Sequence, residues 1–410
     1  MKAPMVDSRP ILLTVHGPDR PGICSAICRV LARHGVPVVD IEQASTHRLL
    51  SLSFVIDVAH MEDEQGDAAL VKELLYEGWQ VGAHVRFEPM KEDDFIAFAE
   101  LTDSVNRNLY AVTVMGNRVG ADGLAAVTGV LARRSANITN IHKLSRRRLA
   151  AVEMIASVPT GGAMAEVKRE LLLAAQGLDI DVAVQRENLY RRSKRLVVFD
   201  MDSTLIAQEV IDEVARVVGC HDRVAELTAR AMRGELAFHE AFAARVELLR
   251  GARLDEIVAR VTPTLEFTAG ALELVGVLKK LGYKLAVISG GFSEFVDPIK
   301  RRLGLDYAFS NQLDVAGGVL TGRVRGEIID RQRKADLMEE IARAEGIQLD
   351  QVMAVGDGAN DITMLERAGL GVAFNAKKTV QDAAQVAVNQ SNMASLLYLL
   401  GIREEEVAEL

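Results

Sequence analysis

The sequence contains little cysteine: Cys24, Cys28 and Cys220 in a chain of 410 residues. So few thiols argue against a disulfide framework and favour a reducing compartment. Cys24 and Cys28 are four residues apart on an expected helix, but no second pair of cysteine or histidine residues follows at metal-ligand spacing. We therefore expect buried thiols there rather than a zinc site.

The chain also lacks long apolar runs, a secretory leader and an excess of basic residues. No run approaches the roughly 18 apolar residues of a membrane helix, and the N-terminal residues have no apolar segment followed by a cleavage site. Lys and Arg number 48 against 57 Asp and Glu, a formal net charge of −9, which argues against a nucleic-acid partner because phosphate binding needs a basic surface. The composition predicts a cytoplasmic protein of two or three domains with no membrane partner.

The first half contains a repeat with an offset of about 100 residues. Val30–Arg33 (VLAR) recurs as Val130–Arg133, and an alternating apolar strand at residues 52–58 recurs at the same offset. Each copy follows the order strand, helix, strand, strand, helix, strand, as judged from helical and alternating apolar periodicity. This order predicts two ferredoxin-like βαββαβ domains, at residues 8–92 and 105–188.

A loop in the first copy, Gly17–Gly22 (GPDRPG), joins the first strand to the first helix. Pro21 and Gly22 permit a tight turn into a helix whose free N–H groups can hold a carboxylate. The loop resembles that of the ACT domain, an amino-acid-sensing module, and the resemblance implies ligand contacts at Asp19 and Gly22. The second copy has Gly116 at the start of the matching loop but lacks the Asp-Arg-Pro run. We therefore expect the ACT fold in this copy, while the missing run argues against ligand binding there.

Two interpretations of the copies remain open: amino-acid sensing, and a structural or dimerising role. Paired ACT domains commonly assemble side by side, which implies a homodimer. Residues 91–103 are rich in charge and are expected to form the boundary between the copies. A basic run, Arg186–Arg195 (RENLYRRSKR), is expected to be a solvated linker to the second half.

The second half, residues 195–400, contains three short apolar runs that each end in polar residues, with helical patterns between and after them. This order predicts a doubly wound α/β domain with a parallel sheet. Ligands of such sheets bind at the carboxyl ends of the strands. The three runs end in Asp200–Thr204 (DMDST), in Ser289–Gly291 (SGG) and in Gly356–Asp361 (GDGAND).

Three carboxylates at these strand ends indicate a metal site. Asp200 and Asp202 are two residues apart in an expected extended segment, so both can face one site, and Asp357 from another strand end joins them. Three carboxylates repel one another unless a cation neutralises them. Ligands that are all oxygen suit Mg²⁺.

Further residues of the same pattern suit an anion. Ser289 and the backbone at Gly290 and Gly291 can donate hydrogen bonds to an anion, because the glycines allow close approach. Lys334 lies near an expected helix start, where a cation is unfavourable unless an anion is close. Together with the acids, these residues predict a Mg²⁺-assisted phosphoryl-transfer site.

The order of these motifs resembles the haloacid dehalogenase superfamily of phosphatases. The resemblance implies that Asp200 is the nucleophile, which forms an aspartyl phosphate, and that Asp202 is the general acid and base. An acid at position 202 is typical of phosphohydrolases, because a departing alkoxide needs a proton. The resemblance also implies Mg²⁺ ligands Asp200, Asp202 and Asp357, and substrate contacts Ser289, Gly290, Lys334 and Asn360.

Residues 206–268 have helical patterns and few strand signals, which predicts a helical cap over the site. Glu209–Glu213 (EVIDE), Met232–Gly234 (MRG), Phe238 and Arg245-Val246 resemble phosphoserine phosphatases. The resemblance implies that Glu209 contacts the substrate ammonium, that Arg245 contacts its carboxylate, and that Met232 and Phe238 close over the substrate. The pairing is physically sound because arginine binds carboxylates through two hydrogen bonds.

Both halves together predict a Mg²⁺-dependent phosphoserine phosphatase, a phosphoric monoester hydrolase that converts O-phospho-L-serine to L-serine and phosphate as the last step of L-serine synthesis. L-serine is the expected effector of the ACT domains. Two alternatives remain: a phosphatase or phosphotransferase for another small phosphorylated metabolite, and an amino-acid sensor with a catalytically dead phosphatase half. The complete set of motif residues argues against a dead enzyme.

Overall fold

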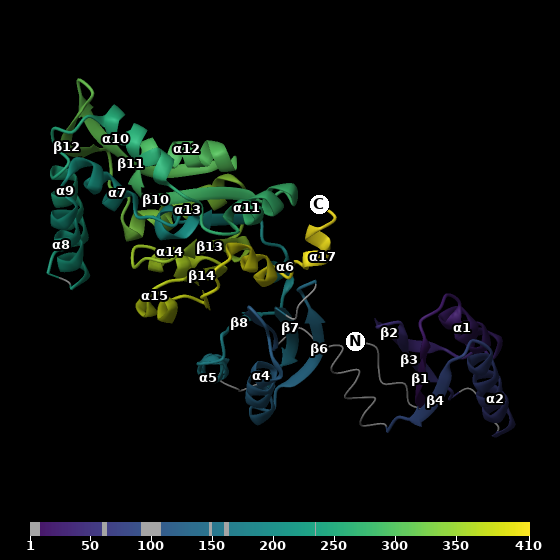
Figure 1. Cartoon of the computed structure of the whole chain (residues 1–410). Helices are drawn as coiled ribbons and strands as arrows, with labels where there is room; N and C mark the ends of the chain where they lie inside the picture. The colour runs from purple at the N-terminus through teal and green to yellow at the C-terminus, as the bar shows by residue number, and fades with distance from the viewer. Residues whose placement is uncertain (1–8, 60–63, 92–107, 147–149, 160–163, 234) are drawn as a thin grey trace. The chain divides into compact units, whose positions relative to one another are not determined.

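The computed structural model (Figure 1) describes residues 9–59, 64–91, 108–146, 150–159, 164–233 and 235–410. The chain divides into two compact units, residues 1–107 and 108–410, which are treated separately below. Most of the charged boundary segment predicted at residues 91–103 lies outside the described residues. No helix in the described ranges is long and apolar enough to span a bilayer.

The first unit contains the first predicted βαββαβ domain. Its four strands form an antiparallel sheet in the order β2-β3-β1-β4, and both helices lie on one face of that sheet (Figure 1). The core forms because alternate strand residues such as Leu13 and Val15 meet the apolar helix residues Ile27 and Leu31. The elements are β1 (Pro10–Pro18), α1 (Ile23–Arg33), β2 (Val38–Thr46), β3 (Leu49–Asp57), α2 (Glu64–Gln80) and β4 (His84–Pro89).

The second copy repeats this topology, with sheet order β6-β7-β5-β8, but its sheet is covered on both faces. Helices cover one face, and Met115, Ala151 and Ala183 on the other belong to the core of the catalytic domain. The second copy is therefore built into the catalytic unit. Its elements are β5 (Leu109–Gly116), α4 (Ala121–Arg133), β6 (Asn137–Lys143), β7 (Ala151–Ser157), α5 (Met164–Ala175) and β8 (Ile180–Arg186).

The expected solvated linker is wrong in part: most of the run is exposed, but Arg191 and Lys194 are buried. Arg191, on the short helix α6 (Leu189–Arg192), is 3% exposed. Its Nη1 lies 2.8 Å from Glu153 Oε2 on β7, and its Nε lies 2.5 Å from Glu187. Lys194 is buried too, and burial lowers its pKa to about 8. A buried carboxylate at Glu153 needs a cation, and the basic run supplies it.

The catalytic domain contains the predicted doubly wound sheet. Its strand order is β12-β11-β10-β9-β13-β14-β15, parallel except for the edge strand β12, and separate apolar clusters cover its two faces. The strands are β9 (Leu196–Phe199), β10 (Lys284–Phe292), β11 (Tyr307–Ala316), β12 (Val319–Arg325), β13 (Val352–Gly356), β14 (Leu370–Phe374) and β15 (Val386–Val388). The helices are α11 (Ala271–Lys280), α12 (Ser293–Leu303), α13 (Arg331–Ala344), α14 (Ile362–Arg367), α15 (Lys378–Ala383), α16 (Leu396–Leu399) and α17 (Glu404–Val407).

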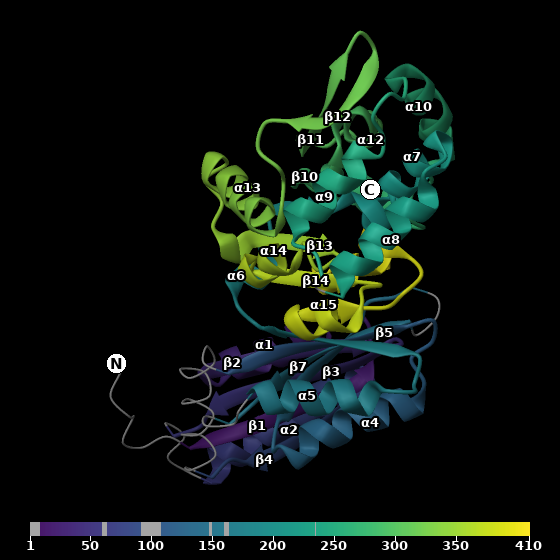
Figure 2. The same cartoon turned by 90° about the vertical axis from the view of Figure 1, so that its left-hand side faces the viewer.

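Four helices form a cap between β9 and α11. An isolated antiparallel bridge, Ile206 to Phe267, joins the two ends of this insertion. The hairpin of β11 and β12, which the sequence did not predict, lies beside the cap helices in both views (Figures 1 and 2). The cap helices are α7 (Val210–Val218), α8 (His221–Met232), α9 (Phe238–Glu247) and α10 (Leu254–Val261).

Candidate active site

The predicted strand ends meet at one edge of the catalytic sheet, because β9 pairs in parallel with both β10 and β13. After β9 the chain enters a tight turn at Met201–Leu205, in which Ser203 has a left-handed φ of 52°. Asp200 (φ −70°, ψ 160°) and Asp202 (φ −66°, ψ 136°) both have extended backbone angles, and the chain turns at Ser203, directly after them. The turn points the Asp202 carboxylate toward the cap, where its Oδ1 accepts a hydrogen bond from the N–H of Val210 at 3.1 Å.

An acidic cluster forms at this edge from Asp200, Asp357 and Asp361, which offer carboxylate oxygens within 4.8 Å of one another. Lys334 Nζ lies 2.7 Å from Asp200 Oδ1 and 2.7 Å from Asp361 Oδ1. Two of the three predicted metal ligands, Asp200 and Asp357, belong to this cluster, and its third carboxylate is Asp361 rather than Asp202. Asp361 is the last residue of the GDGAND motif and was not among the predicted site residues, although its side chain is fully buried.

The cluster carries more negative than positive charge. Burial raises the pKa of Asp200, and the nearby charge of Asp361 raises it further. Burial and the charge of Asp361 also raise the pKa of Asp357, to about 6. Burial alone would lower the pKa of Lys334, but the charges of Asp200 and Asp361 outweigh it and raise that pKa. The three carboxylates and the single lysine leave two negative charges in excess, and such a donor set of oxygens alone fits a divalent cation such as Mg²⁺.

Two threonines fix the third carboxylate. Thr204 Oγ1 donates to Asp357 Oδ1 at 2.9 Å, and Thr268 Oγ1 donates to the Thr204 carbonyl at 2.6 Å. Since Thr204 is fully buried, the rotation of the Asp357 side chain is set by packing as well as by hydrogen bonding.

The loop after β10 lies against the same site. Ser289 is fully buried, and its Oγ accepts from the Gly291 N–H at 2.8 Å and lies 3.5 Å from Asp202 Oδ2. A Cβ on Gly291 would lie 3.0 Å from Asp202 Oδ2, whereas one on Gly290 would meet nothing closer than 3.8 Å. Gly291 therefore packs closely against Asp202, whereas the space beside Gly290 is open. The Asn360 amide makes no hydrogen bond to the described residues.

The cap contributes an acid near Asp202. Glu209 Oε1 accepts a hydrogen bond from Ser203 Oγ at 2.7 Å. Burial raises the pKa of Asp202 to about 7, and the charge of Glu209 adds to this effect. A carboxyl with a pKa near neutrality can donate and accept a proton in turn, as a general acid and base must.

The cap also contributes an arginine, Arg245, with a hydrogen-bond donor that has no acceptor among the described residues. Arg245 Nε is buried without a partner among the described residues, and its Nη1 is 3.5 Å from Thr228 Oγ1. Burial lowers the pKa of Arg245, while the charges of Glu209 and Asp212 oppose this shift. A buried guanidinium donor without an acceptor is unfavourable, so the group is suited to an incoming anion.

Of the two predicted apolar cap residues, the structure describes the side chain of Phe238 but not that of Met232. Phe238 is 37% exposed and stacks on Phe242 at 6.1 Å between ring centroids. Met232 ends α8, and its side chain lies outside the described part of the chain. Beside Phe238, His239 Nε2 lies 3.0 Å from Asp330 Oδ2, which links the cap to the residue that caps the start of α13.

The expected regulatory residues belong to different units. In the first unit, Gly22 has a left-handed φ of 100° at the start of α1, and Asp19 Oδ2 accepts from Ser45 Oγ at 2.6 Å. In the second unit, a Cβ on Gly116 would lie 2.6 Å from the Asp179 carbonyl oxygen. Close backbone packing is therefore sufficient to explain the glycine at Gly116.

Comparisons with known proteins agree with this architecture. A family model described as haloacid dehalogenase-like hydrolase matches residues 197–366, and two ACT domain models match residues 9–88 and 109–185. The chain is 41% identical over 404 residues to a phosphoserine phosphatase of Streptomyces coelicolor, covering 97% of this chain and 93% of the relative. It is 36% identical over 397 residues to one of Mycobacterium tuberculosis, covering 97% and 94%.

Solved structures show the same likeness. The unliganded structure of a probable phosphoserine phosphatase from Vibrio cholerae matches with a TM-score of 0.58 and 32% identity, covering 74% of this chain and 90% of that one. A haloacid dehalogenase family hydrolase from Salmonella enterica matches with a TM-score of 0.63 and 28% identity, covering 71% and 98%.

Proposed function

Because this chain belongs to the phosphoserine phosphatase family of haloacid dehalogenase-like hydrolases, we propose that it hydrolyses O-phospho-L-serine to L-serine and phosphate. The observation that carries this proposal is the placement of Asp200. Its carboxylate is held by Lys334 beside Asp202, under a cap that offers the partly unpaired Arg245.

The chemistry follows from the two aspartates at the end of β9. Asp200 Oδ1 accepts from Lys334 Nζ at 2.7 Å and from the Met201 N–H at 2.8 Å, which fixes the rotation of the carboxylate. The carboxylate attacks phosphorus and the seryl oxygen leaves, taking a proton from Asp202. Asp202 then accepts a proton from the water that hydrolyses the acyl phosphate, and so returns to its starting form.

Asp200, Asp202 and Asp357 are the residues that would hold Mg²⁺, and Asp361 adds a further carboxylate beside Asp200 and Asp357. The ion would supply positive charge against the phosphate and the crowded carboxylates. Ser289 and Asn360 can donate hydrogen bonds to the phosphate oxygens, and Lys334 adds a fixed positive charge.

The cap would select the amino-acid part of the substrate. A substrate carboxylate satisfies the buried donor of Arg245, and a substrate ammonium pairs with Glu209. A phosphatase or phosphotransferase for a different small phosphomonoester would not need both charges. The pair of cap charges therefore favours phosphoserine over that alternative.

The family resemblance supports three further elements of the proposal. The enzyme acts in the cytoplasm as the last step of L-serine synthesis, it assembles as a homodimer through ACT domains, and L-serine binds at the helix start after Gly22. The exposed edge strand β2 and the open loop at Gly22 are available for such contacts within the first unit.

The reaction is tested by phosphate release from O-phospho-L-serine with purified full-length protein, with Mg²⁺ and with excess chelator. We expect turnover with Mg²⁺ and its loss in chelator, with recovery when Mg²⁺ is restored. Full activity in chelator would refute the metal role. No release from phosphoserine under any metal condition would refute the substrate.

If L-serine regulates the enzyme through the first ACT domain, its inhibition of the full chain should differ from its inhibition of residues 108–410. These residues form one compact unit that includes the second ACT domain. L-serine should inhibit the full chain more strongly than this fragment, because only the full chain has the Gly22 loop. Allosteric coupling of this kind typically amounts to about 1–3 kcal/mol, or roughly 5- to 150-fold in affinity. Equal inhibition of both would mean that L-serine acts as a product at the active site.

A further inference from the structure

Helix α9 of the cap carries two residues of the proposed site, Phe238 at its first position and Arg245 near its end. Its two ends are held to the rest of the catalytic domain in different ways. Just after the C-terminal end, the Gly251 N–H donates to the Leu320 carbonyl on β12 at 2.9 Å, and the Leu320 N–H donates to the Ala252 carbonyl at 2.9 Å. This end is therefore fixed by main-chain hydrogen bonds to the hairpin of β11 and β12.

The N-terminal end of α9 is held by a side chain. His239 Nε2 lies 3.0 Å from Asp330 Oδ2, and in the described ranges this is the one hydrogen bond or ion pair that joins helix α8 or α9 to a residue outside the cap. The helix has 10 residues, which corresponds to a length of about 15 Å. Phe238 therefore lies at the end that is far from the main-chain bonds and close to this side-chain bond.

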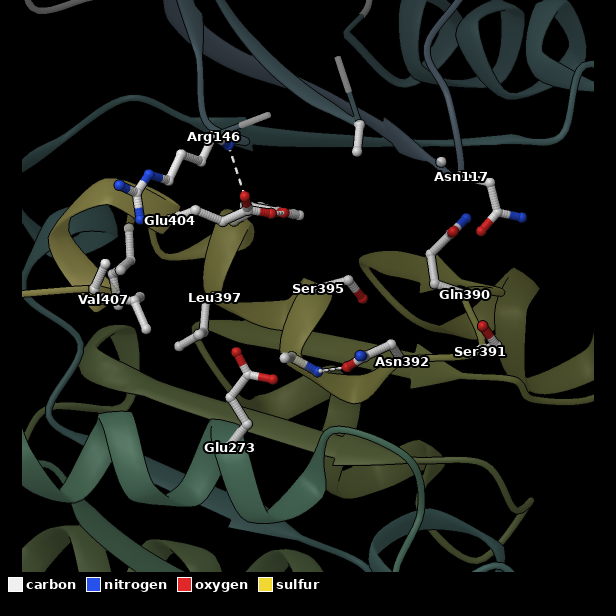
Figure 3. A pocket seen from close by; sticks show the side chains of 16 residues that line it. Asn117, Arg146, Glu273, Gln390, Ser391, Asn392, Ser395, Leu397, Glu404 and Val407 are labelled. Carbon is white, nitrogen blue, oxygen red and sulfur yellow. Dashed lines mark hydrogen bonds between the residues drawn. The ribbon is translucent and has the colours of Figure 1, made fainter. Parts of the chain in front are cut away.

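The junction between the second ACT domain and the catalytic domain gives a contrast. There the Arg146 N–H donates to Glu404 Oε2 at 2.6 Å (Figure 3). Asp181 Oδ2 also accepts from the Asn389 N–H at 2.8 Å and from the Gln390 side chain at 2.7 Å. Several hydrogen bonds hold that junction, whereas the loss of one hydrogen bond can release the start of α9.

The acceptor of the His239 hydrogen bond is fixed on the catalytic side. Asp330 Oδ1 accepts from the Arg333 N–H at 2.8 Å and so caps α13, and the Asp330 carbonyl accepts from the Lys334 N–H at 2.9 Å. Burial alone would raise the pKa of Asp330, but the hydrogen bonds from Arg333 and His239 outweigh it and lower that pKa. Since a charged carboxylate can only accept, His239 Nε2 is the donor.

The His239 ring also contacts the residue before it. The ring meets Phe238 edge-on, with 5.7 Å between the ring centroids and 84° between the planes. Phe238 stacks on Phe242, whose ring centroid lies 6.3 Å from that of Phe292 at the end of β10. The hydrogen bond that orients the His239 ring therefore also restrains the ring of Phe238.

We propose that His239 is a positioning residue of the cap, which holds Phe238 over the bound substrate through its hydrogen bond to Asp330. This inference rests on the proposed function, in which Phe238 closes over phosphoserine. The His239 side chain is 57% exposed and that of Asp330 is 29% exposed. Exposed pairs of this kind are weak, so the bond can break to admit a substrate and form again once it is bound.

The proposal is tested by a double-mutant cycle of His239→Phe and Asp330→Ser, with KM and kcat for phosphoserine measured on full-length protein with Mg²⁺. Phenylalanine keeps a ring beside Phe238 and removes the N–H donor. Serine still caps α13 but has no second oxygen for His239. Each single variant should raise KM about two- to fivefold and change kcat less than about twofold. The double variant should raise KM no further, because both changes remove the same bond.

Two more variants separate this role from a general effect on the cap. His239→Gln keeps an N–H donor at a similar reach and should restore the wild-type KM. His221→Phe is the matched control and should leave KM unchanged, since the partner of His221 is Asp222 on its own helix. Unchanged KM in His239→Phe, a double variant whose effect is the product of the single effects, or no restoration by His239→Gln would each overturn the proposal.

Hydrogen exchange tests the bond itself without any substrate. Amides at residues 241–244 should exchange about two- to fivefold faster in His239→Phe and in Asp330→Ser than in the wild type, and His221→Phe should not change them. Equal exchange in all four proteins would overturn the proposal. If the wild type does not hydrolyse phosphoserine, the proposed function fails, and the exchange rates still decide whether His239 holds the start of α9 on Asp330.

Discussion

The two sides of the active site differ in how far their charges are already paired. On the strand-end side, Lys334 is bound between Asp200 and Asp361, and Asp357 is fixed by Thr204. On the cap side, a buried donor of Arg245 has no partner within the described residues. On the proposed mechanism, the strand-end groups are preorganised for chemistry, while a substrate would complete the hydrogen bonding of the cap.

This difference gives a rule for mutational effects. A change on the strand-end side should impair the hydrolysis of every phosphomonoester, because all of them share the phosphoryl group. A change on the cap side should impair only substrates that carry the matching charge. The comparison fails if the two classes of variant show the same substrate dependence.

The largest effect is expected for Asp200→Asn. The amide is a poor nucleophile and also weakens the ion pair with Lys334, so turnover of phosphoserine and of p-nitrophenyl phosphate should both be abolished, as measured by phosphate release. Asp222→Asn is the matched control, because that carboxylate is fully exposed on a cap helix. Near-normal activity in Asp200→Asn would show that another residue is the nucleophile.

A smaller loss is expected for Asp202→Asn, since it removes proton transfer and keeps the nucleophile. General acid and base assistance typically contributes 10²–10⁴-fold, so kcat for phosphoserine should fall by roughly that factor. The loss should be smaller for p-nitrophenyl phosphate, whose leaving group needs less protonation. A uniform loss on both substrates would argue that Asp202 acts on the phosphate or the metal instead.

The smallest and most selective effect is expected for Arg245→Ala. Losing a charge-assisted pair costs about 1.5–3 kcal/mol, or roughly a 10- to 150-fold drop in kcat/KM for phosphoserine. Activity on p-nitrophenyl phosphate, which has no carboxylate, should change little. Arg216→Ala, an exposed arginine on α7, controls for general effects on the cap. An equal drop on both substrates would place Arg245 in the fold or at the phosphate.

Much of the strand-end side was predictable because motifs at parallel strand ends must converge. Asp200, Ser289 and Asp357 were assigned to one site from order alone, and the sheet brings them together. The contribution of Asp361 was not recognised, although it belongs to a quoted motif. Its place depends on contacts that a sequence pattern does not show: Asp361 accepts from Lys334 Nζ at 2.7 Å and from the Gly358 N–H at 3.0 Å.

The attachment of the second ACT domain was not predictable from local pattern. A run of basic residues is usually solvated, yet Arg191 is buried because Glu153 lies opposite it, 38 residues away in the chain. Asp181 on β8 likewise accepts from Gln390 at 2.7 Å, across more than half of the chain. Such pairs depend on tertiary packing, so composition and periodicity predict the modules but not which of them share a core.

The central claim is that the cap recognises both charges of an amino-acid phosphate. The most direct measurement compares kcat/KM of the wild-type enzyme for O-phospho-L-serine, for phosphoethanolamine, which lacks the carboxylate, and for 3-phosphoglycerate, which lacks the ammonium. We predict a loss of at least about tenfold for each analogue, as expected when one charge-assisted contact is missing. Equal kcat/KM values for all three substrates would contradict the account.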